Sequence, residues 1–200
     1  MNLQEKPSVL ILAAGTSGRM GQLKAFLPFD RYRCFLEKII ADYFAFGVFE
    51  LAVVLNEKGM ERFNELTFPN KDAVKTVLNP FPERERFFSV QTGLAALSAS
   101  GAVFLHNVDN PFVHQDVLAL LVKQLKPGTY VIPVFENHGG HPVLLSKEIV
   151  GSLVSISDYT LNLKTVLQAH ASIRVPVHDA WVLVNINNRD DYHRYINQKP

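Results

Sequence analysis

The 200-residue sequence has only one cysteine, Cys34, so no internal disulfide can form. This absence excludes the disulfide-stapled class of small secreted domains and favours a reducing compartment. A single cysteine within an apolar helical segment is typical of a packing residue rather than a nucleophile.

Long apolar runs and a strong net charge are also missing. No apolar stretch approaches the roughly 20 residues that span a bilayer, and the N-terminal stretch lacks the pattern of a signal peptide. The formal net charge is +1 at pH 7, so nothing points to nucleic acid or a membrane as a partner. We expect a cytoplasmic protein. Because no repeat or long linker interrupts the chain, residues 1–200 are predicted to form a single domain.

What the sequence does contain is an alternation of short apolar runs with helical patterns. Strands are predicted at 8–14, 49–55, 74–78, 102–106, 129–135, 142–145, 173–177 and 181–184, with a turn at 137–140. Helices are predicted at 34–46, 58–66, 88–99, 115–125, 161–170 and 189–196. This order indicates βαβ units, hence an α/β fold with a mostly parallel central sheet. Ligands of such sheets bind beyond the carboxyl ends of the strands.

The first buried strand runs into a glycine-rich loop that reads Ala13-Ala14-Gly15-Thr16-Ser17-Gly18-Arg19-Met20-Gly21-Gln22-Leu23-Lys24. Its glycines allow a sharp turn whose N–H groups bind phosphate oxygens. Arg19 and Lys24 add two cations. A plain connection with two solvated cations is the alternative, because the loop is neither a Walker A sequence nor G-x-G-x-x-G.

A carboxylate stands after a later strand. Asp109 follows residues 102–106 and precedes Pro111. At the carboxyl end of a strand facing a triphosphate, it suits Mg²⁺, which takes few protein oxygens and otherwise uses water and phosphate. An Asx turn before a proline is the alternative interpretation.

The glycine-rich loop resembles a family signature. Residues 12–21 followed by Lys24 match L-A-A-G-x-S-x-R-M-G-x-x-K of the MobA-like nucleotidyltransferases. That superfamily includes molybdenum-cofactor cytidylyl- and guanylyltransferases and, more distantly, methylerythritol-phosphate cytidylyltransferases. The resemblance implies a Rossmann-like, three-layer nucleotidyltransferase fold of the glycosyltransferase-A type, Mg²⁺, and release of pyrophosphate. It implies nucleotide binding by Ala13, Ala14, Gly15, Thr16, Ser17, Gly18, Arg19 and Lys24, and catalytic roles for Arg19, Lys24 and Asp109.

Two segments, residues 106–113 and 184–192, form the predicted metal corner and resemble the same family. The first segment resembles it in two alternative alignments. Residues 109–113 are similar to G-D-x-P-x-V of the molybdenum-cofactor group, with Val108 in place of the glycine. Residues 106–113 also resemble H-D-A-A-R-P-F of the isoprenoid enzymes, whose aspartate falls on Asn107. Residues 184–192 resemble the family's D-I-D-T-P-E-D or N-I-N-T-P-E-D segment, which makes Asn187 the second metal contact beside Asp109. Asn187 as a helix N-cap is the alternative, although Asn188 fits that role better.

Two further segments bear on the substrates. Residues 85–94 resemble E-R-x-x-S-V-x-x-G-L of the isoprenoid enzymes and G-M-S-S-S-V-x-x-G-L of the cofactor enzymes. They nominate Ser89 for nucleotide binding or as an N-cap, and Gly93 for nucleotide binding or close packing. Residues 140–144 match G-H-P-V-L of the molybdenum-cofactor group, which nominates His141 for acceptor binding; a turn residue with a structural hydrogen bond is the alternative.

The sequence as a whole therefore predicts a Mg²⁺-dependent nucleotidyltransferase. Its predicted partners are a nucleoside triphosphate and a small phosphorylated acceptor. The resemblance to the molybdenum-cofactor group makes molybdopterin the expected acceptor. CTP is favoured because the Ala13-Ala14-Gly15 turn resembles the cytidylyl branch. The alternatives are a methylerythritol-phosphate-type or sugar-phosphate nucleotidyltransferase, or a nucleotide-binding protein without turnover, which Val108 and the uncharged Asn187 favour.

Overall fold

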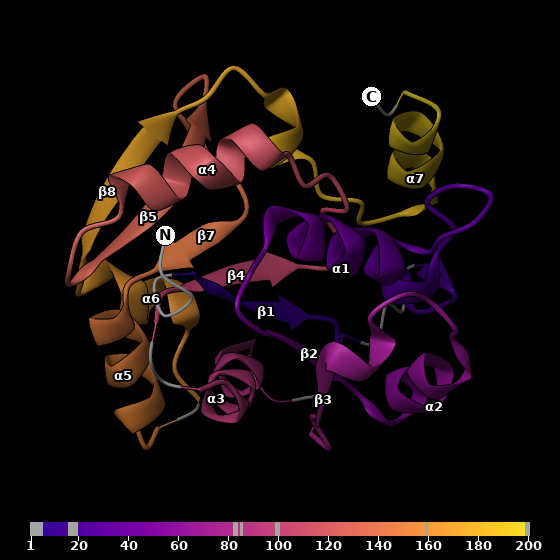
Figure 1. Ribbon diagram of the computed structural model, residues 1–200, viewed down its shortest axis with the longest axis horizontal. Helices are drawn as coiled ribbons and strands as arrows, with labels where there is room; N and C mark the ends of the chain where they lie inside the picture. Colours follow the sequence, from indigo (N-terminus) through magenta and orange to yellow (C-terminus); the bar gives the residue numbers. More distant parts are fainter. Residues whose placement is uncertain are drawn as a thin grey trace.

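The computed structural model describes residues 6–15, 20–81, 84, 86–98, 101–158 and 160–198 (Figure 1). The strands are β1 (Ser8–Leu12), β2 (Leu51–Leu55), β3 (Val74–Leu78), β4 (Val103–Asn107), β5 (Thr129–Phe135), β6 (His138–Gly139), β7 (Val143–Leu145) and β8 (Ala171–Pro176). The α-helices are α1 (Phe35–Phe46), α2 (Glu57–Glu65), α3 (Arg86–Ala96), α4 (Gln115–Gln124), α5 (Lys147–Ser155), α6 (Leu163–Gln168) and α7 (Arg189–Ile196). Short 3-10 helices occupy Lys24–Phe26, Lys71–Ala73 and Ala180–Leu183.

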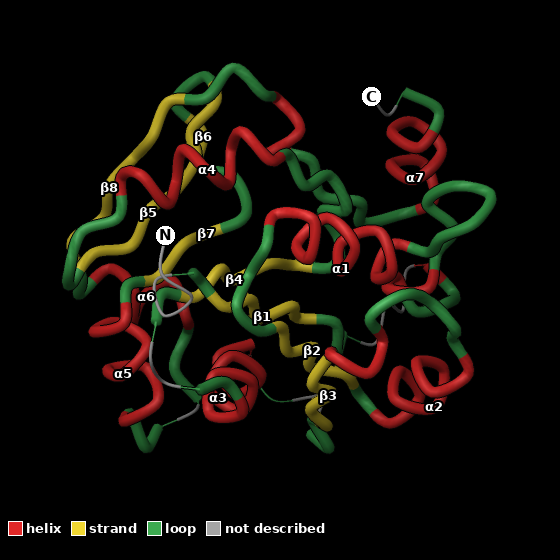
Figure 2. The backbone as a smooth tube through the Cα atoms, in the orientation of Figure 1, coloured by secondary structure: helices red, strands yellow, loops and turns green. Residues whose placement is uncertain are grey.

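All eight strands join one mixed, mostly parallel sheet. Its order is β3-β2-β1-β4-β7-β5-β6, with β8 paired to β5. The first four strands of that order are parallel, and β1 lies between β2 and β4 (Figure 2). β7 is inserted antiparallel between β4 and β5, and β8 is parallel to β5. The carboxyl ends of β1 and β4 therefore leave the sheet side by side.

Both faces of the sheet are covered, which makes three layers. Successive residues of a strand point to opposite faces, so Val9 and Ile11 join one buried cluster while Leu10 joins the other. The first cluster includes the apolar sides of α1 and α4, and the second includes those of α3, α5 and α6. Figure 1 shows α1 and α4 on one side of the sheet and α3 and α5 on the other.

Helix ends follow local chemistry. α1 ends at Gly47, whose φ of 84° is a left-handed conformation that glycine adopts without a side-chain penalty. α2 begins at Asn56, whose side chain accepts a hydrogen bond from the N–H of Gly59. α7 begins at Asn188 with a reciprocal capping box to Asp191.

The predicted α/β class and mostly parallel sheet are confirmed, two local predictions are wrong, and one helix was missed. Residues 181–184 are not a strand. Ala180–Leu183 is a 3-10 turn in which the Asp179 carboxylate accepts the Trp181 N–H, and Trp181 packs on Phe112 with ring centroids 4.3 Å apart. The helix Lys147–Ser155 was not predicted at all. The turn predicted at 137–140 falls at Glu136 and Asn137, both with positive φ, while His138–Gly139 pairs as β6.

Most other predicted elements agree with the structure to within about two residues at each end. The largest shift is at the predicted helix 88–99, which begins at Arg86 and ends three residues early at Ala96. No helix among the described residues is long and apolar enough to cross a membrane.

Candidate active site

The loop after β1 begins as a tightly held turn. The Asn56 amide, at the carboxyl end of β2, donates to the carbonyl oxygen of Ala14 at 3.0 Å and lies 3.5 Å from that of Gly15. The Ala13 N–H donates to the carbonyl of Val54. Ala13 and Ala14 are buried and Gly15 is exposed. The turn therefore presents its glycine to solvent just where the phosphate-binding segment is predicted to start.

Three predicted site residues meet beyond this turn. Lys24 Nζ donates to Asn187 Oδ1 at 2.9 Å and lies 3.9 Å from Asp109 Oδ2. Asp109 Oδ1 is buried and has no hydrogen-bond partner among the described residues. One ammonium group thus joins the loop after β1, the loop after β4 and the segment before α7.

The position of Asn187 is set by hydrogen bonds on both sides. The Ile186 N–H donates to the carbonyl of Asp109 at 2.7 Å, which ties this segment to the loop after β4. The Asp191 carboxylate accepts the N–H groups of Asn187 at 2.9 Å and Asn188 at 3.3 Å. Asn188 is the N-cap of α7, as predicted, so Asn187 is free of that role. These backbone hydrogen bonds hold Asn187 in the place where its side chain accepts from Lys24.

A second polar chain runs beside this group. Arg86 Nη2 donates to Asn107 Oδ1 at 2.5 Å, and Asn107 Nδ2 lies 3.2 Å from His141 Nε2. Because the amide nitrogen can only donate, His141 Nε2 accepts and the proton of the neutral ring is on Nδ1. That Nδ1 is buried and has no hydrogen-bond partner among the described residues. His141 therefore carries a buried N–H donor that no described residue accepts.

The glycine before His141 has a structural purpose. A Cβ on Gly140 would lie 2.4 Å from the carbonyl oxygen of Val182, which also accepts the His141 N–H at 2.8 Å. Only a residue without a side chain allows this approach. The segment around Val182 thus holds the backbone of His141 against the loop of Asn110, whose amide donates to the Trp181 and Val182 carbonyls.

Burial and the surrounding cations shift the pKa of Asp109 in opposite directions. Burial raises the pKa of Asp109 above its ordinary value, and the charges of Lys24 and Arg86 lower it in part. Burial lowers the pKa of His141 to about 4, and the positive charge of Arg86 adds to this effect. His141 is therefore neutral near pH 7, with a hydrogen-bond donor and no positive charge.

The donor set fits a hard divalent cation that is shared with phosphates. No group of three or more His, Cys, Asp or Glu side chains in the described part of the chain could hold a metal alone. Mg²⁺ does not need such a cage, because it is commonly held by one or two protein oxygens together with substrate phosphates and water. The buried, unbonded Asp109 Oδ1 and the adjacent amide oxygen of Asn187 match that pattern.

Other predicted site residues lie elsewhere. Gly93 of α3 faces the sheet, where a Cβ would come within 2.3 Å of Leu10 and 2.7 Å of Val54; close packing, not ligand approach, explains this glycine. Ser89 is the fourth residue of α3, so its interpretation as an N-cap is wrong. It is buried, and its hydroxyl accepts from Asn79 Nδ2 at 2.8 Å. Thr16, Ser17, Gly18 and Arg19 fall outside the described residues.

Sequence reasoning missed two members of the site, Arg86 and Asn107. Both were present in quoted motifs, Arg86 in E-R-x-x-S-V and Asn107 in the isoprenoid register of the metal corner. A signal for Asn107 was its position at the end of β4, two residues before Asp109. Arg86 and His141 both contact the side-chain amide of Asn107. Asp109, whose Oδ1 has no hydrogen-bond partner among the described residues, is therefore the residue suited to metal.

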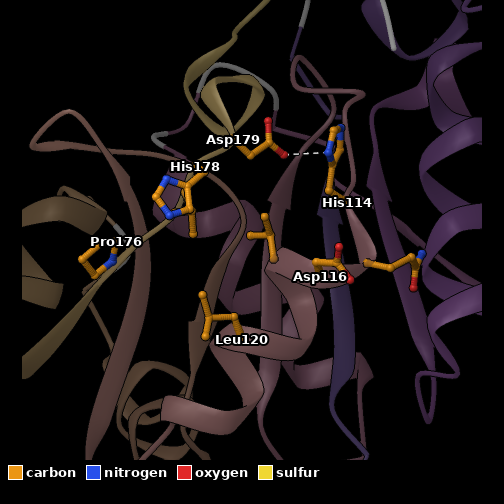
Figure 3. A pocket seen from close by; sticks show the side chains of 9 residues that line it. His114, Asp116, Leu120, Pro176, His178 and Asp179 are labelled. Carbon is orange, nitrogen blue, oxygen red and sulfur yellow. Dashed lines mark ion pairs between the residues drawn. The ribbon is translucent and has the colours of Figure 1, made fainter.

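A separate cavity of about 570 Å³ lies between the N-terminal end of α4 and the end of β8 (Figure 3). Val117, Leu120, Pro176 and Val177 give it apolar walls. At its rim His114 Nδ1 and Asp179 Oδ2 form an ion pair at 2.6 Å, drawn dashed in Figure 3. None of Lys24, Asp109 and Asn187 lines this cavity, so it is distinct from the group around Lys24.

The fold, the glycine-rich loop after β1 and the position of Asp109 after β4 are consistent with the match of this chain to a protein family. The model of the MobA-like NTP transferase domain matches residues 9–175. The chain belongs to this family. The matched segment includes the loop after β1, Asp109 and His141, and ends before Asn187 and α7.

Individual relatives agree with this membership. The molybdenum cofactor cytidylyltransferase of Escherichia coli is 24% identical over 183 residues, which cover 92% of this chain and 92% of that protein. The 2-C-methyl-D-erythritol 4-phosphate cytidylyltransferase of Bacteroides fragilis is 29% identical over 131 residues, covering 64% of this chain and 59% of that protein. A Mycobacterium tuberculosis protein solved in complex with manganese has the same fold, with a TM-score of 0.75 at 19% identity and coverage of 97% and 100%. This MobA-like chain is a nucleotidyltransferase by family.

Proposed function

We propose that the chain acts as one nucleotidyltransferase domain over residues 1–200 and transfers CMP from CTP to a small phosphorylated acceptor of the molybdopterin kind. The carrying observation is the meeting of Lys24, Asp109 and Asn187, with Lys24 Nζ 2.9 Å from the amide oxygen and 3.9 Å from the carboxylate. A cation between two oxygen ligands is the arrangement that a metal–triphosphate needs. The cytidylyltransferase relatives support the choice of CTP.

The reaction is an in-line displacement. An oxygen of the acceptor phosphate forms a bond to the α-phosphorus, the bond from that phosphorus to the β-bridging oxygen breaks, and its electron pair leaves with pyrophosphate. A phosphate nucleophile is already ionised near neutral pH, so no general base is required. Catalysis then depends on positioning and on stabilising charge as it moves to the leaving group.

The residues divide this work between them. The turn at Ala13, Ala14 and Gly15, continued by residues 16–19, holds the phosphates, and Arg19 and Lys24 stabilise the charge on them. Asp109 and Asn187 would hold Mg²⁺, which when bound would act as a Lewis acid and reduce the negative charge on the phosphates. The solved relative with manganese supports a divalent cation in this family. Each charge-assisted hydrogen bond contributes about 1.5–3 kcal/mol.

On the acceptor side the proposal assigns His141. Its ring is neutral, its Nε2 is directed to Asn107, and its buried Nδ1–H has no hydrogen-bond partner among the described residues. A neutral N–H donor orients an acceptor phosphate without adding positive charge that would weaken it as a nucleophile. Arg86 contacts the same Asn107 side chain, and its positive charge attracts an anionic acceptor toward His141.

The nucleobase side is proposed to involve Phe88. Phe87 is fully buried in the core, but Phe88 is only partly buried and packs against Phe81 and Arg84 near the first turn of α3. If a base stacks on Phe88, Phe88→Ser should weaken CTP binding by about 1–3 kcal/mol, the usual scale for lost base stacking. Comparing CTP, UTP, GTP and ATP in the wild type and this variant tests both ideas. Tighter binding of a purine nucleotide by the wild type would refute the cytosine preference.

A second candidate is the methylerythritol-phosphate type of cytidylyltransferase. The observation in its favour is Arg86, which comes from the E-R-x-x-S-V motif of those enzymes and contacts Asn107 in the site. The two candidates share the nucleotide and differ in the acceptor. Pyrophosphate release with CTP and either molybdopterin or methylerythritol phosphate distinguishes them, and nucleotide binding without release with any acceptor would indicate a protein without turnover.

A thermal-shift screen of CTP, GTP, ATP and UTP, each with and without Mg²⁺, is the first test. Ligand at about 100 times its dissociation constant stabilises the folded state by about 2.7 kcal/mol. We expect the largest shift with CTP and Mg²⁺ together. The absence of a shift with every nucleotide would contradict the proposed function.

A further inference from the structure

The first residue of α7, Arg189, directs its side chain to Gly21, near the end of the glycine-rich segment after β1. Gly21 is in a left-handed conformation with φ of 72°, and a Cβ built on it would lie 3.4 Å from Arg189 Nη2. The guanidinium group therefore rests beside the glycine that closes the predicted phosphate-binding segment, three residues before Lys24 in the chain.

This contact is held by the way α7 is attached. The Tyr192 hydroxyl donates to the carbonyl of Pro28 at 2.8 Å, and the Tyr192 ring packs on Phe35 of α1 with centroids 6.0 Å apart. At the start of the helix, Asn187 accepts from Lys24. Two attachments on either side of Arg189 thus fix where its side chain begins, and Figure 1 shows α7 beside the segment that leads into α1.

The chemical setting of Arg189 favours an anion. Its side chain is exposed, and it makes no hydrogen bond or ion pair with any residue that the structure describes. It carries a positive charge at the N-terminal end of a helix, where the macrodipole disfavours cations. Lys24 brings a second positive charge to Asn187, two residues before Arg189. An anion between Arg189 and Lys24 would offset the unfavourable interaction of Arg189 with the helix dipole and the repulsion between the two positive charges.

The residue type departs from the family pattern quoted above. In the N-I-N-T-P-E-D segment the position of Arg189 holds proline, which cannot reach a ligand with charge. An arginine can bind two phosphate oxygens at once through its planar fork.

We propose that Arg189 is a pyrophosphate-binding residue of this chain, supplied by α7 and contacting the β- and γ-phosphates from the side of Gly21. The inference rests on the proposed nucleotidyl transfer, in which those phosphates leave as pyrophosphate. Arg189 and Lys24 then hold the leaving group from the two sides of Asn187, and the guanidinium stabilises the charge that it gains as the bond to the α-phosphorus breaks.

The test is calorimetric titration of wild type, Arg189→Ala and the control Arg194→Ala with Mg²⁺ and three probes: CTP, CMP and inorganic pyrophosphate. Arg194 is an exposed arginine in the last turn of the same helix. We expect Arg189→Ala to weaken CTP and pyrophosphate by about 10–100-fold, the scale of one hydrogen bond to a charged group, and to change CMP affinity less than about twofold. Arg194→Ala should match the wild type with all three probes.

Each other result has a definite meaning. Wild-type affinity of Arg189→Ala for CTP and pyrophosphate overturns the role of Arg189 and leaves the proposed function intact. Equal weakening of CTP and CMP also overturns it, because the contact would then be to the nucleoside or α-phosphate. A wild type that binds none of the three probes contradicts the proposed function and the inference together. If Arg189→Ala melts at a lower temperature than Arg194→Ala, Arg189→Gln, which keeps the length of the side chain, replaces it in the same titrations.

Discussion

Lys24 Nζ and Asn187 Oδ1 are 2.9 Å apart although 163 residues separate them in the chain. The bond joins the start of the fold to its last helix across the carboxyl ends of β1 and β4. Lys24 is also 3.9 Å from Asp109 Oδ2, so the same ammonium lies between the two predicted metal contacts. Under the proposed function a metal–triphosphate would bind these three side chains, which the fold already brings together.

Replacing Lys24 should separate binding from folding. Lys24 begins the short 3-10 helix Lys24–Phe26, and its ammonium donates to Asn187 beside Asp109. Lys24→Ala should lower the free energy of unfolding by about 1.5–3 kcal/mol, the scale of one hydrogen bond to a charged group, and leave the protein folded. Nucleoside triphosphate affinity should fall at least about tenfold. Calorimetric titration checks this, with Lys58→Ala on the exposed surface of α2 as the control. Equal affinities of the two variants would show that the loop is only a connector.

His106 predicts how stability changes with pH. The ring is fully buried, with Nδ1 2.9 Å from the Tyr43 hydroxyl and Nε2 2.7 Å from the carbonyl of Asn110. Burial lowers its pKa from 6.5 to about 3, and the bond to Asn110 opposes that shift only in part. Between these values the unfolded chain binds a proton that the native state does not. The free energy of unfolding should therefore fall as pH is lowered through this window, by up to about 1.4 kcal/mol per pH unit for this residue.

Urea denaturation at pH 7, 6 and 5 measures that slope. His141, whose pKa is lowered to about 4, adds a second contribution of the same sign. His106→Gln removes the first contribution, so its slope should be shallower than that of the wild type. Parallel slopes for the two proteins would show that His106 does not remain neutral in the folded state.

Gly93 separates packing from ligand binding. Because a Cβ there would lie 2.3 Å from Leu10, Gly93→Ala should destabilise the protein by about 1–3 kcal/mol through overpacking. The matched control is Gly151→Ala in α5, where the new Cβ would meet nothing within 4 Å beyond its own stretch of helix and alanine is the better helix former. Thermal unfolding of both variants measures the two changes in stability. A Gly93→Ala protein with unchanged stability but weakened nucleotide affinity would return Gly93 to the nucleotide site.

Much of the candidate site could be predicted from the sequence because each of its parts is recognisable within its own segment. Buried strands end in glycine or polar residues, and the carboxyl ends of parallel strands meet, so Lys24 and Asp109 were expected to be near each other. Asn188 was predicted as the cap of α7 from the polar residues before an amphipathic run, and the structure confirms it. The motif match added Asn187, which no periodicity would have selected.

The remainder depends on contacts between distant segments. Residues 181–184 look like a strand by composition, but Trp181 instead packs on Phe112 and the Val182 carbonyl binds the backbone of His141. Nothing in the local pattern predicts that partner. Arg86 and Arg189 were overlooked because each is a solvated cation in its own segment. Only the folded chain places one against Asn107 and the other against Gly21.

The most direct test of the central claim is calorimetric titration of CTP into wild type and Asp109→Asn, each with and without Mg²⁺. Asp109 Oδ1 is buried with no hydrogen-bond partner among the described residues, and the amide of asparagine keeps the shape of the carboxylate while removing its charge. The account predicts that Mg²⁺ strengthens CTP binding to the wild type and has little effect on Asp109→Asn, while the two proteins bind metal-free CTP alike. An Asp109→Asn protein with the magnesium-dependent affinity of the wild type would contradict the account.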